Sequence, residues 1–586
     1  MKLPRLKYSD GIKKTVQTGF GGYNHTPAAG DGELWDMENM SSASYPLLSP
    51  RPRRRLVSEL SSPGCIFGHE KLLYIDGTQL YYGGVLRGEV TAGDKRIAAL
   101  GDRLVIFPDK VVLNVRYERI GVYATVSELQ GAVPSPVRGD AYGVGSGCPY
   151  EIFVWDGESW LSNGLELQSL ESAWSGSSLE FKNGTLYGES AAANTVKNSA
   201  VNWRNYFRAG DAVTISGCTL HPKNNKTPII REISDDGHEM RFYENVFELA
   251  GADGTTAYTE TGAISVKRTV PDLTDVCVSD NRVWGCMGDT IYCCALGDPF
   301  NWNVFDGLET DAWACETGTP GDFNACRTYL GYPIFFKDDA VCKVYGSLPS
   351  NFSPMSSATL GVVKGGIDSI AAAGEILFYL SKAGIVAYSG GVPTAISAPF
   401  GDVRYTEAVG GSDGLKYYVS MKSADGEWSL FTYDTTVGKW YREDALHAMG
   451  MAYADGNLHI LAYDGKLWLS GNITDAPPGS VEEDRVHWYA EFGDFTDMSP
   501  NAKAVSKIQL RLELDIGSSV EVQIKYDSEG EWLTAGSVSA VTKRSVYLPV
   551  VPRRADHYRL RLEGVGGCRI YSISKEFYTG SAIGTK

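Results

Sequence analysis

The sequence predicts an all-β protein: a β-propeller of about seven blades, an inserted small β-barrel or sandwich domain, and a C-terminal antiparallel β-sandwich. Three observations support this prediction. Hairpin signals repeat along the chain, long alternating strands fill its last part, and helical periodicity is hard to find. The composition agrees, because 66 glycines accompany 33 tyrosines and 13 tryptophans in 586 residues. Such a composition is typical of short aromatic strands joined by tight turns.

The propeller prediction depends on repeated hairpins. Asp-Gly, Gly-Asp or Asp-Asp turns separate apolar strands in segments such as 72–82 (LLYIDGTQLYY), 286–294, 335–346 and 458–471. In the second half of the chain they recur at roughly 45 to 50 residues, a spacing typical of four-stranded blades. We therefore assign 61–118 and 269–480 to the propeller. A plain array of β-sandwiches is the alternative.

Three other regions differ from the predicted propeller in residue composition and pattern. Residues 1–60 are rich in Gly, Pro and Asn and predict an extended arm, which must lie across its own propeller or a neighbouring subunit to satisfy its backbone. Residues 119–268 break the repeat and predict an inserted β domain. Residues 481–586 alternate with period two, with Ile508, Leu510 and Leu512 on one face, and predict the sandwich, of about eight strands.

Charge argues against a conventional nucleic-acid binder. The net charge of −17 is spread over the chain and repels polyanions. Two dense basic clusters are candidates for contact with phosphate or with an acidic neighbouring subunit, and a solvated arginine run is the alternative for each. The clusters are Arg51, Arg53, Arg54 and Arg55, and Arg553 with Arg554.

No motif indicates catalysis, a cofactor or a metal. The eight histidines are scattered, H-E-x-x-H and Walker A patterns are missing, and no G-x-S-x-G elbow lies near a candidate triad. We expect the eleven cysteines to be buried free thiols, and no zinc. The turns in 423–430 (SADGEWSL) and 526–533 (YDSEGEWL) lack the spacing of a sialidase Asp-box and predict ordinary hairpins. The first residues show no apolar signal region and no stretch approaches a membrane span, so we expect a soluble protein made in the cytoplasm.

Several short motifs together resemble the tail-hub, or packaged-DNA stabilisation, proteins of tailed bacteriophages. They are 36–53 (DMENMSSASYPLLSPRPR), 295–307 (ALGDPFNWNVFDG), 332–352, 376–397 and the terminal 577–581 (FYTGS). The resemblance implies a β-propeller that assembles as a ring, typically a hexamer, around the DNA exit channel below the head-to-tail connector. Trp302 and Phe305 would then be candidates for subunit interfaces. Trp302 suits a propeller core equally well.

On this basis we expect a structural virion protein, not an enzyme, at the tail or head-tail junction. It would form a nozzle ring that retains packaged DNA, contact connector and tail proteins, and pass DNA without sequence-specific binding. An acidic channel wall would weaken the binding of DNA phosphates to the channel. Two alternatives stay open. One is a receptor- or carbohydrate-binding tail component, with Trp488, Trp532 and Tyr558 exposed on the sandwich. The other is a propeller glycoside hydrolase with two facing carboxylates.

Overall fold

The fold is taken from a computed structural model, which describes residues 12–186, 189–243, 246–252, 254–497, 502–527, 530–539 and 543–579. The first eleven residues of the predicted arm and the last two of the 577–581 motif lie outside these ranges. The described chain is nearly all β, so the predicted fold class is confirmed. Its helices are short: α1 (Val126–Ala132) and the 3-10 turns η1 (Trp203–Asn205), η2 (Pro222–Asn224), η3 (Pro349–Asn351), η4 (Lys364–Ser369) and η5 (Ala398–Phe400).

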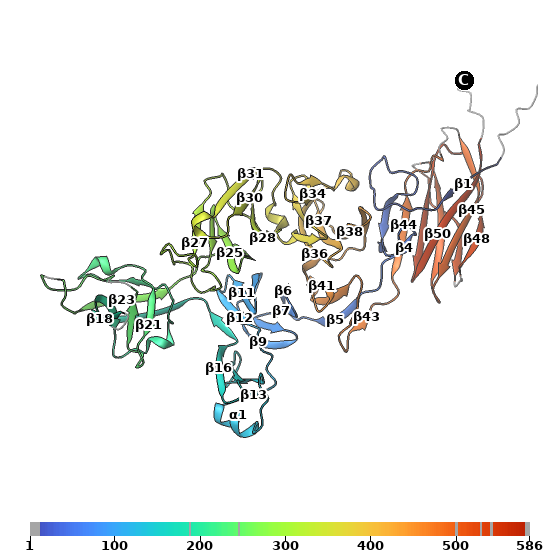
Figure 1. The fold of residues 1–586 in the computed structure, drawn as a ribbon. Coiled ribbons are helices and arrows are strands. Elements are labelled where there is room, and N and C mark those ends of the chain that lie inside the picture. Colours follow the sequence, from blue (N-terminus) through green and yellow to red (C-terminus); the bar gives the residue numbers. More distant parts are fainter. Residues whose placement is uncertain are drawn as a thin grey trace, which may run out of the picture. The chain divides into compact units, whose positions relative to one another are not determined.

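Among the described residues, seven sheets of four or five strands repeat along the chain, as the blades of a β-propeller do (Figure 1). The first contains β6 (Pro63–Gly68), β7 (Leu72–Asp76), β8 (Gln79–Tyr82) and β9 (Val85–Glu89). The second contains β10 (Arg96–Leu100), β11 (Arg103–Phe107), β12 (Val111–Asn114) and β17 (Leu167–Ser169). The third contains β24 (Asp275–Ser279), β25 (Arg282–Met287), β26 (Thr290–Cys293) and β27 (Trp313–Glu316).

The remaining sheets follow in sequence order. The fourth contains β28 (Ala325–Tyr329), β29 (Tyr332–Phe336), β30 (Ala340–Tyr345) and β31 (Ser353–Ala358). The fifth contains β32 (Ala371–Ala373), β33 (Ile376–Ser381), β34 (Gly384–Tyr388) and β35 (Thr394–Ala395). The sixth contains β36 (Tyr405–Ser412), β37 (Lys416–Ser423), β38 (Trp428–Asp434) and β39 (Lys439–Arg442). The seventh contains β40 (Ala448–Ala454), β41 (Asn457–Ala462), β42 (Lys466–Ser470), β5 (Arg55–Glu59) and β43 (Val481–Glu482).

The chain divides into two compact units, residues 1–76 with 363–586 (unit 1) and residues 77–362 (unit 2). Within unit 1 the first strands of neighbouring sheets lie side by side in the order β32, β36, β40 and β6. Within unit 2 the corresponding order is β10, β24 and β28. The seventh sheet is completed by β5, which pairs antiparallel with β42 (Leu469 opposite Arg55). A strand that precedes the first sheet in sequence therefore closes the last one.

The C-terminal sandwich belongs to unit 1. One sheet has the order β1 (Lys13–Gln17), β50 (Cys568–Thr579), β45 (Lys503–Leu514) and β48 (Arg544–Pro549). The other has the order β2 (Leu34–Glu38), β44 (His487–Phe492), β49 (Tyr558–Val565), β46 (Ser519–Tyr526) and β47 (Leu533–Ser539). The predicted alternation is present, because Ile508, Leu510 and Leu512 are fully buried.

The N-terminal arm lies on its own chain. Its strands β1 and β2 form edges of the two sandwich sheets, and the short pair β3 (Met40–Ser41) and β4 (Ser49–Pro50) follows. The arm also reaches the sixth sheet, where the Tyr23 amide donates to the Trp440 carbonyl at 2.6 Å. The backbone groups that such an arm cannot pair internally are thus paired within unit 1.

Residues 119–268, expected as one inserted domain, hold two sheets in unit 2. The first contains β13 (Val122–Tyr123), β14 (Ala141–Val144), β15 (Glu151–Trp155) and β16 (Trp160–Leu165). The second has the order β20 (Thr214–Ser216), β23 (Tyr258–Arg268), β18 (Ser172–Leu186), β19 (Glu189–Lys197), β22 (Glu239–Phe242) and β21 (Ile230–Ile233), with Trp174, Trp203 and Phe242 in its core. Between them, β17 returns to pair with β12 in the second propeller sheet.

Candidate functional site

A hollow of about 690 Å³ lies in unit 1 where three segments meet, and we call it the Trp35 pocket. The N-terminal arm supplies one wall, the connection from β35 to β36 a second, and the turn between β37 and β38 a third. This volume is typical of sites for small ligands. The lining residues are His25, Thr26, Pro27, Trp35, Gly401, Asp402, Val403, Arg404, Ser423, Ala424 and Asp425.

Two aromatic rings form the wall on the arm. His25 and Trp35 stack with their centroids 4.2 Å apart and an interplanar angle of 30°, and His25 Nδ1 lies 2.9 Å from the Trp35 carbonyl oxygen. The Arg559 guanidinium lies over the Trp35 ring, 4.6 Å from its centroid, and is itself held by Asp494 at 2.6 Å. Stacking and cation–π contacts thus hold the indole in place. The pocket therefore has an aromatic wall, part of whose ring surface is already covered by these internal contacts.

A glycine lets the second wall approach the arm closely. The turn η5 ends at Gly401, whose φ is 63°. A Cβ at this position would lie 2.7 Å from the His25 carbonyl oxygen, closer than real contacts allow. The His25 amide donates to the Pro399 carbonyl at 2.7 Å, which ties the arm to this connection. Only glycine suits both the backbone conformation and the contact.

The other walls carry free charges. Asp402, Arg404 and Asp425 are exposed, and within the described chain their side chains have no hydrogen bond or ion pair. The turn is fixed to the connection by the Ala424 amide, which donates to the Arg404 carbonyl at 2.9 Å. Two carboxylates and a guanidinium are therefore held near an aromatic wall with their hydrogen-bonding capacity unused.

The sequence alone did not predict this pocket. His25 and Trp35 lie in a segment predicted only as an arm, and Asp402 lies in an ordinary connection. Asp425 falls in the SADGEWSL segment, whose prediction as a hairpin turn is confirmed by the pairing of β37 with β38. No spacing rule links residues separated by several hundred positions. The only sequence signal was the surface carboxylate in that turn.

The predicted basic cluster of the arm is largely internal. Arg51 and Arg54 are 5% and 3% exposed, so they cannot meet a phosphate or another subunit, and this part of the prediction is corrected. The physical reason is that three carboxylates of unit 1 neutralise them, which makes their burial tolerable. Those carboxylates belong to Glu443, Asp444 and Glu483. Arg53 and Arg55 lie nearer the surface, with the partners Glu482 and Ser480 respectively.

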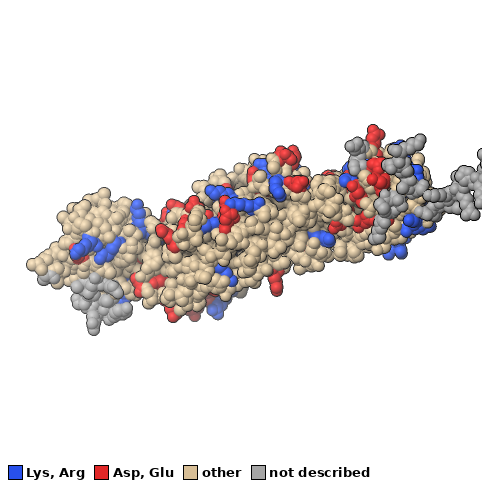
Figure 2. All heavy atoms as spheres, turned by 90° about the horizontal axis from the view of Figure 1, so that it is seen from above, with Lys and Arg blue, Asp and Glu red and all other residues tan. Residues whose placement is uncertain are grey.

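The other predicted residues divide between core and surface. Trp302 is 2% exposed and its Nε1 donates to the Pro299 carbonyl at 2.8 Å, so it is a core residue of unit 2. Phe305 is 60% exposed, and Arg553 and Arg554 are exposed. On the face seen in Figure 2, acidic and basic side chains are interspersed. Two of the three aromatic residues that would support a lectin-like sandwich, Trp488 and Tyr558, are buried in its core.

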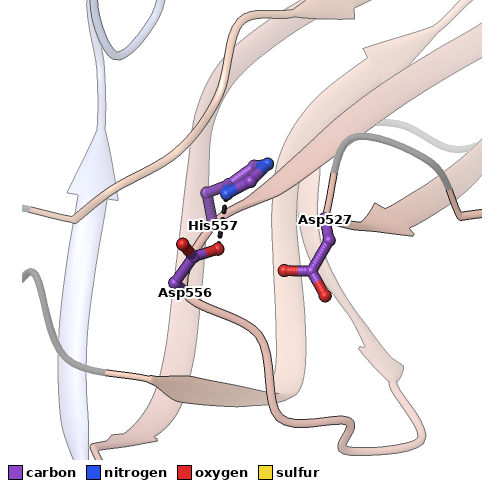
Figure 3. Close-up of side chains that lie close together, drawn as sticks. All are labelled: Asp527, Asp556 and His557. Carbon is purple, nitrogen blue, oxygen red and sulfur yellow. Dashed lines mark hydrogen bonds and ion pairs between the residues drawn. The ribbon is translucent and has the colours of Figure 1, made fainter.

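One group of side chains has the composition of a metal site. Asp527, Asp556 and His557 come from two neighbouring loops of the sandwich, and their ligand atoms lie within 4.8 Å of one another (Figure 3). His557 Nδ1 is already 2.5 Å from an Asp556 oxygen, and both aspartates are exposed. Because a surface hydrogen bond between adjacent residues accounts for the Asp556–His557 contact, we assign no metal to this group. Among the described residues, no helix is long and apolar enough to cross a membrane.

Comparison with known proteins yields structural matches only. No protein-family model and no curated protein matches the sequence. An exo-β-1,3-galactanase variant from Phanerochaete chrysosporium is 10% identical, with 50% of this chain and 94% of that chain covered and a TM-score of 0.17. A family 43 arabinoxylan arabinofuranohydrolase from Bacillus subtilis is 11% identical, with 89% and 96% covered and a TM-score of 0.15. A Trypanosoma rangeli sialidase is 9% identical, with 96% of each chain covered and a TM-score of 0.19.

These comparisons correct the expected function. We expected a non-enzymatic virion protein that forms a ring in the phage connector or tail hub. The glycoside hydrolases among the matched structures contradict that expectation, including the expectation that the chain is not an enzyme.

Proposed function

We propose that this chain binds glycans in the Trp35 pocket. One face of a sugar ring presents C–H groups, which pack favourably against an aromatic ring, while its hydroxyls need hydrogen-bond partners. Where they line the pocket, the Trp35 and His25 rings offer the first kind of contact, and Asp402, Asp425 and Arg404 offer the second. The observation that carries the proposal is this convergence, in one 690 Å³ hollow, of a rigid aromatic wall with unpaired charged side chains.

A second candidate activity, hydrolysis of the bound glycan, is favoured by the two carboxylates. Glycoside hydrolysis commonly uses two carboxyl groups that flank the scissile bond. One donates a proton to the leaving oxygen, and the other either activates water or attacks the anomeric carbon before water completes the reaction. Asp402 and Asp425 come from different walls of the pocket, as residues that flank a ligand must. A homo-oligomer and protein partners stay predictions from the sequence.

The binding proposal is tested with wild-type protein on a glycan array, followed by calorimetric titration of the best oligosaccharide. Trp35→Ala should weaken binding about 30-fold, since a buried aromatic anchor contributes ~2 kcal/mol. Asp402→Asn should weaken it about 10-fold, the effect of losing one charge-assisted hydrogen bond. The matched controls Trp532→Ala and Asp475→Asn change the same residue types outside the pocket and should bind normally.

Two outcomes would overturn the glycan-binding proposal: no glycan retained by the wild-type protein, or equal binding by Trp35→Ala and by Trp532→Ala. Hydrolysis is followed separately, by the release of reducing ends from the retained oligosaccharide. Loss of turnover in both Asp402→Asn and Asp425→Asn, with binding still measurable, supports the second candidate. Binding without turnover in the wild-type protein rejects hydrolysis and leaves glycan binding in place.

A further inference from the structure

A second hollow, of about 380 Å³, lies in unit 2 and shares no residue with the Trp35 pocket. It is formed by the turn between β10 and β11, by β12 and the residues after it, by β16 and β17, by the turn between β24 and β25, and by the loops that follow η1 and β26. We call it the arginine pocket. It is lined by Leu100, Asp102, Arg103, Val112, Asn114, Arg116, Asn163, Gln168, Arg208, Asn281, Gly297 and Phe300.

The lining of the arginine pocket is cationic in an acidic protein. Three guanidinium groups face one aspartate there, although the whole chain carries a net charge of −17. Within the described chain, Arg103 and Arg116 have no carboxylate partner. The Arg103 side chain has one long contact, 3.5 Å to the Gly297 carbonyl, and Arg116 is exposed, with its guanidinium 5.4 Å from the centre of the Tyr117 ring. Two positive charges are therefore available to an anionic ligand.

The third guanidinium is fixed and helps to shape the pocket. Arg208 forms an ion pair of 2.6 Å with Asp298 and one of 3.2 Å with the buried Asp211. Its guanidinium carbon also lies 4.2 Å from the centre of the Phe300 ring. Because two carboxylates already neutralise it, we count Arg208 as part of the framework, and only Arg103 and Arg116 as ligand-binding cations.

The neutral part of the lining consists of carboxamides. Gln168 Nε2 donates to the Leu165 carbonyl at 3.0 Å, which leaves its amide oxygen as an acceptor. The side chains of Asn163 and Asn281 make no hydrogen bond within the described chain. Each carboxamide offers both donors and an acceptor. A group of them suits hydroxyls, which both donate and accept, better than a bare inorganic anion.

We propose that the arginine pocket binds a small hydroxylated carboxylic acid, the class to which sugar acids belong. The ligand carboxylate lies between Arg103 and Arg116, and its hydroxyls contact Asn163, Gln168 and Asn281. The pocket has room for one such molecule, since small-ligand sites start at about 300 Å³. Inorganic phosphate shares the anionic charge but not the hydroxyl pattern, so the two ligands can be told apart. This site is independent of glycan binding in the Trp35 pocket.

The probe is glucuronic acid, titrated calorimetrically into the full chain beside glucose and inorganic phosphate. We expect saturable binding of glucuronate, with glucose and phosphate each at least about 10-fold weaker, because each lacks one of the two kinds of contact. Arg103→Gln and Arg116→Gln should each weaken glucuronate binding about 10-fold or more. Asn163→Ala should weaken glucuronate but leave phosphate unchanged.

The control is Arg138→Gln, the same change at an exposed arginine of unit 2 outside the pocket, and it should bind as the wild type does. The unfolding midpoint of each variant should equal the wild-type value, which shows that a loss of binding does not result from a loss of folding. The proposal is overturned if glucuronate does not saturate the protein, if phosphate binds as tightly as glucuronate, or if Arg138→Gln weakens binding as much as Arg103→Gln. None of these results affects binding in the Trp35 pocket, which is measured with Trp35→Ala.

Discussion

Arg54 links the N-terminal arm to the propeller by ion pairs, and replacing Arg54 should destabilise unit 1. Its guanidinium forms hydrogen bonds of 2.6 and 3.2 Å with Asp444 and one of 2.7 Å with Glu443. The side chains of Arg54 and Glu443 are only 4% and 6% exposed. Burial by itself would lower the pKa of Arg54 and raise that of Asp444, but the opposite charges outweigh it and shift both pKa values the other way. Arg54 and Asp444 thus stay charged in the folded protein because they pair with each other.

The expected loss of stability depends on the carboxylates that Arg54→Met would leave without this partner. In Arg54→Met, three carboxylates would face Arg51 alone, whose nitrogens lie 3.8 Å from Glu443 and 3.5 Å from Asp444. Breaking a buried ion pair on one side costs about 3–5 kcal/mol. Because the Asp444 side chain is 22% exposed and can be rehydrated, we expect about 3 kcal/mol, the lower end of that range.

The assay is urea unfolding at pH 7, with Arg53→Met as the matched control. Arg53 and Glu482 are both 44% exposed at the side chain, and such a surface pair contributes less than about 1 kcal/mol. The folded-state pKa values of Asp444 and Glu483 are lowered, so their contribution is present above about pH 4 and is lost as the pH falls further. The gap between wild type and Arg54→Met should therefore narrow in acid. Equal losses in Arg54→Met and Arg53→Met at pH 7 would refute the reasoning.

Three further predictions concern other parts of the chain. Gly401→Ala should abolish glycan binding, because its Cβ would meet the His25 carbonyl oxygen. Gly414 also has a positive φ, 95°, but lies in open space, so Gly414→Ala should bind glycan normally. Equal glycan binding by these two variants would contradict the prediction. His459 is 4% exposed and burial lowers its pKa, so its contribution to stability is lost as the pH falls below about 6.5. Between pH 7 and 5, the free energy of unfolding of His459→Gln should fall less steeply than that of the wild type. Equal pH slopes for the two proteins would contradict this prediction. Burial also raises the pKa of Cys293 to about 12; an aromatic disulfide reagent should label at most the three half-buried thiols of the native chain, and all eleven after unfolding.

Much of the fold was predictable from local sequence. The 458–471 segment forms the β41–β42 hairpin, and the alternation of 503–514 forms β45, as their turn residues and apolar periodicity indicate. These features depend on residues a few positions apart. The completion of the seventh sheet by β5 was not predictable, because its pairing with β42 joins segments about 410 residues apart in the numbering.

The chemistry of the chain was less predictable. Arg51 and Arg54 have the sequence context of a basic surface patch, and only the positions of Glu443, Asp444 and Glu483 show that they are internal. The same limit applies to the Trp35 pocket, whose aromatic rings and carboxylates come from segments with no shared motif.

The sequence by itself determined that this protein is built from short antiparallel strands, where its hairpins turn, and which face of each sandwich strand is apolar. Turn geometry and side-chain alternation depend on adjacent residues, so they can be recognised in one dimension. Tertiary structure alone decided which charges are buried, which strand completes the seventh sheet, and which residues share a pocket. Those properties depend on contacts between distant segments, and such contacts form only when the whole chain buries its apolar surface.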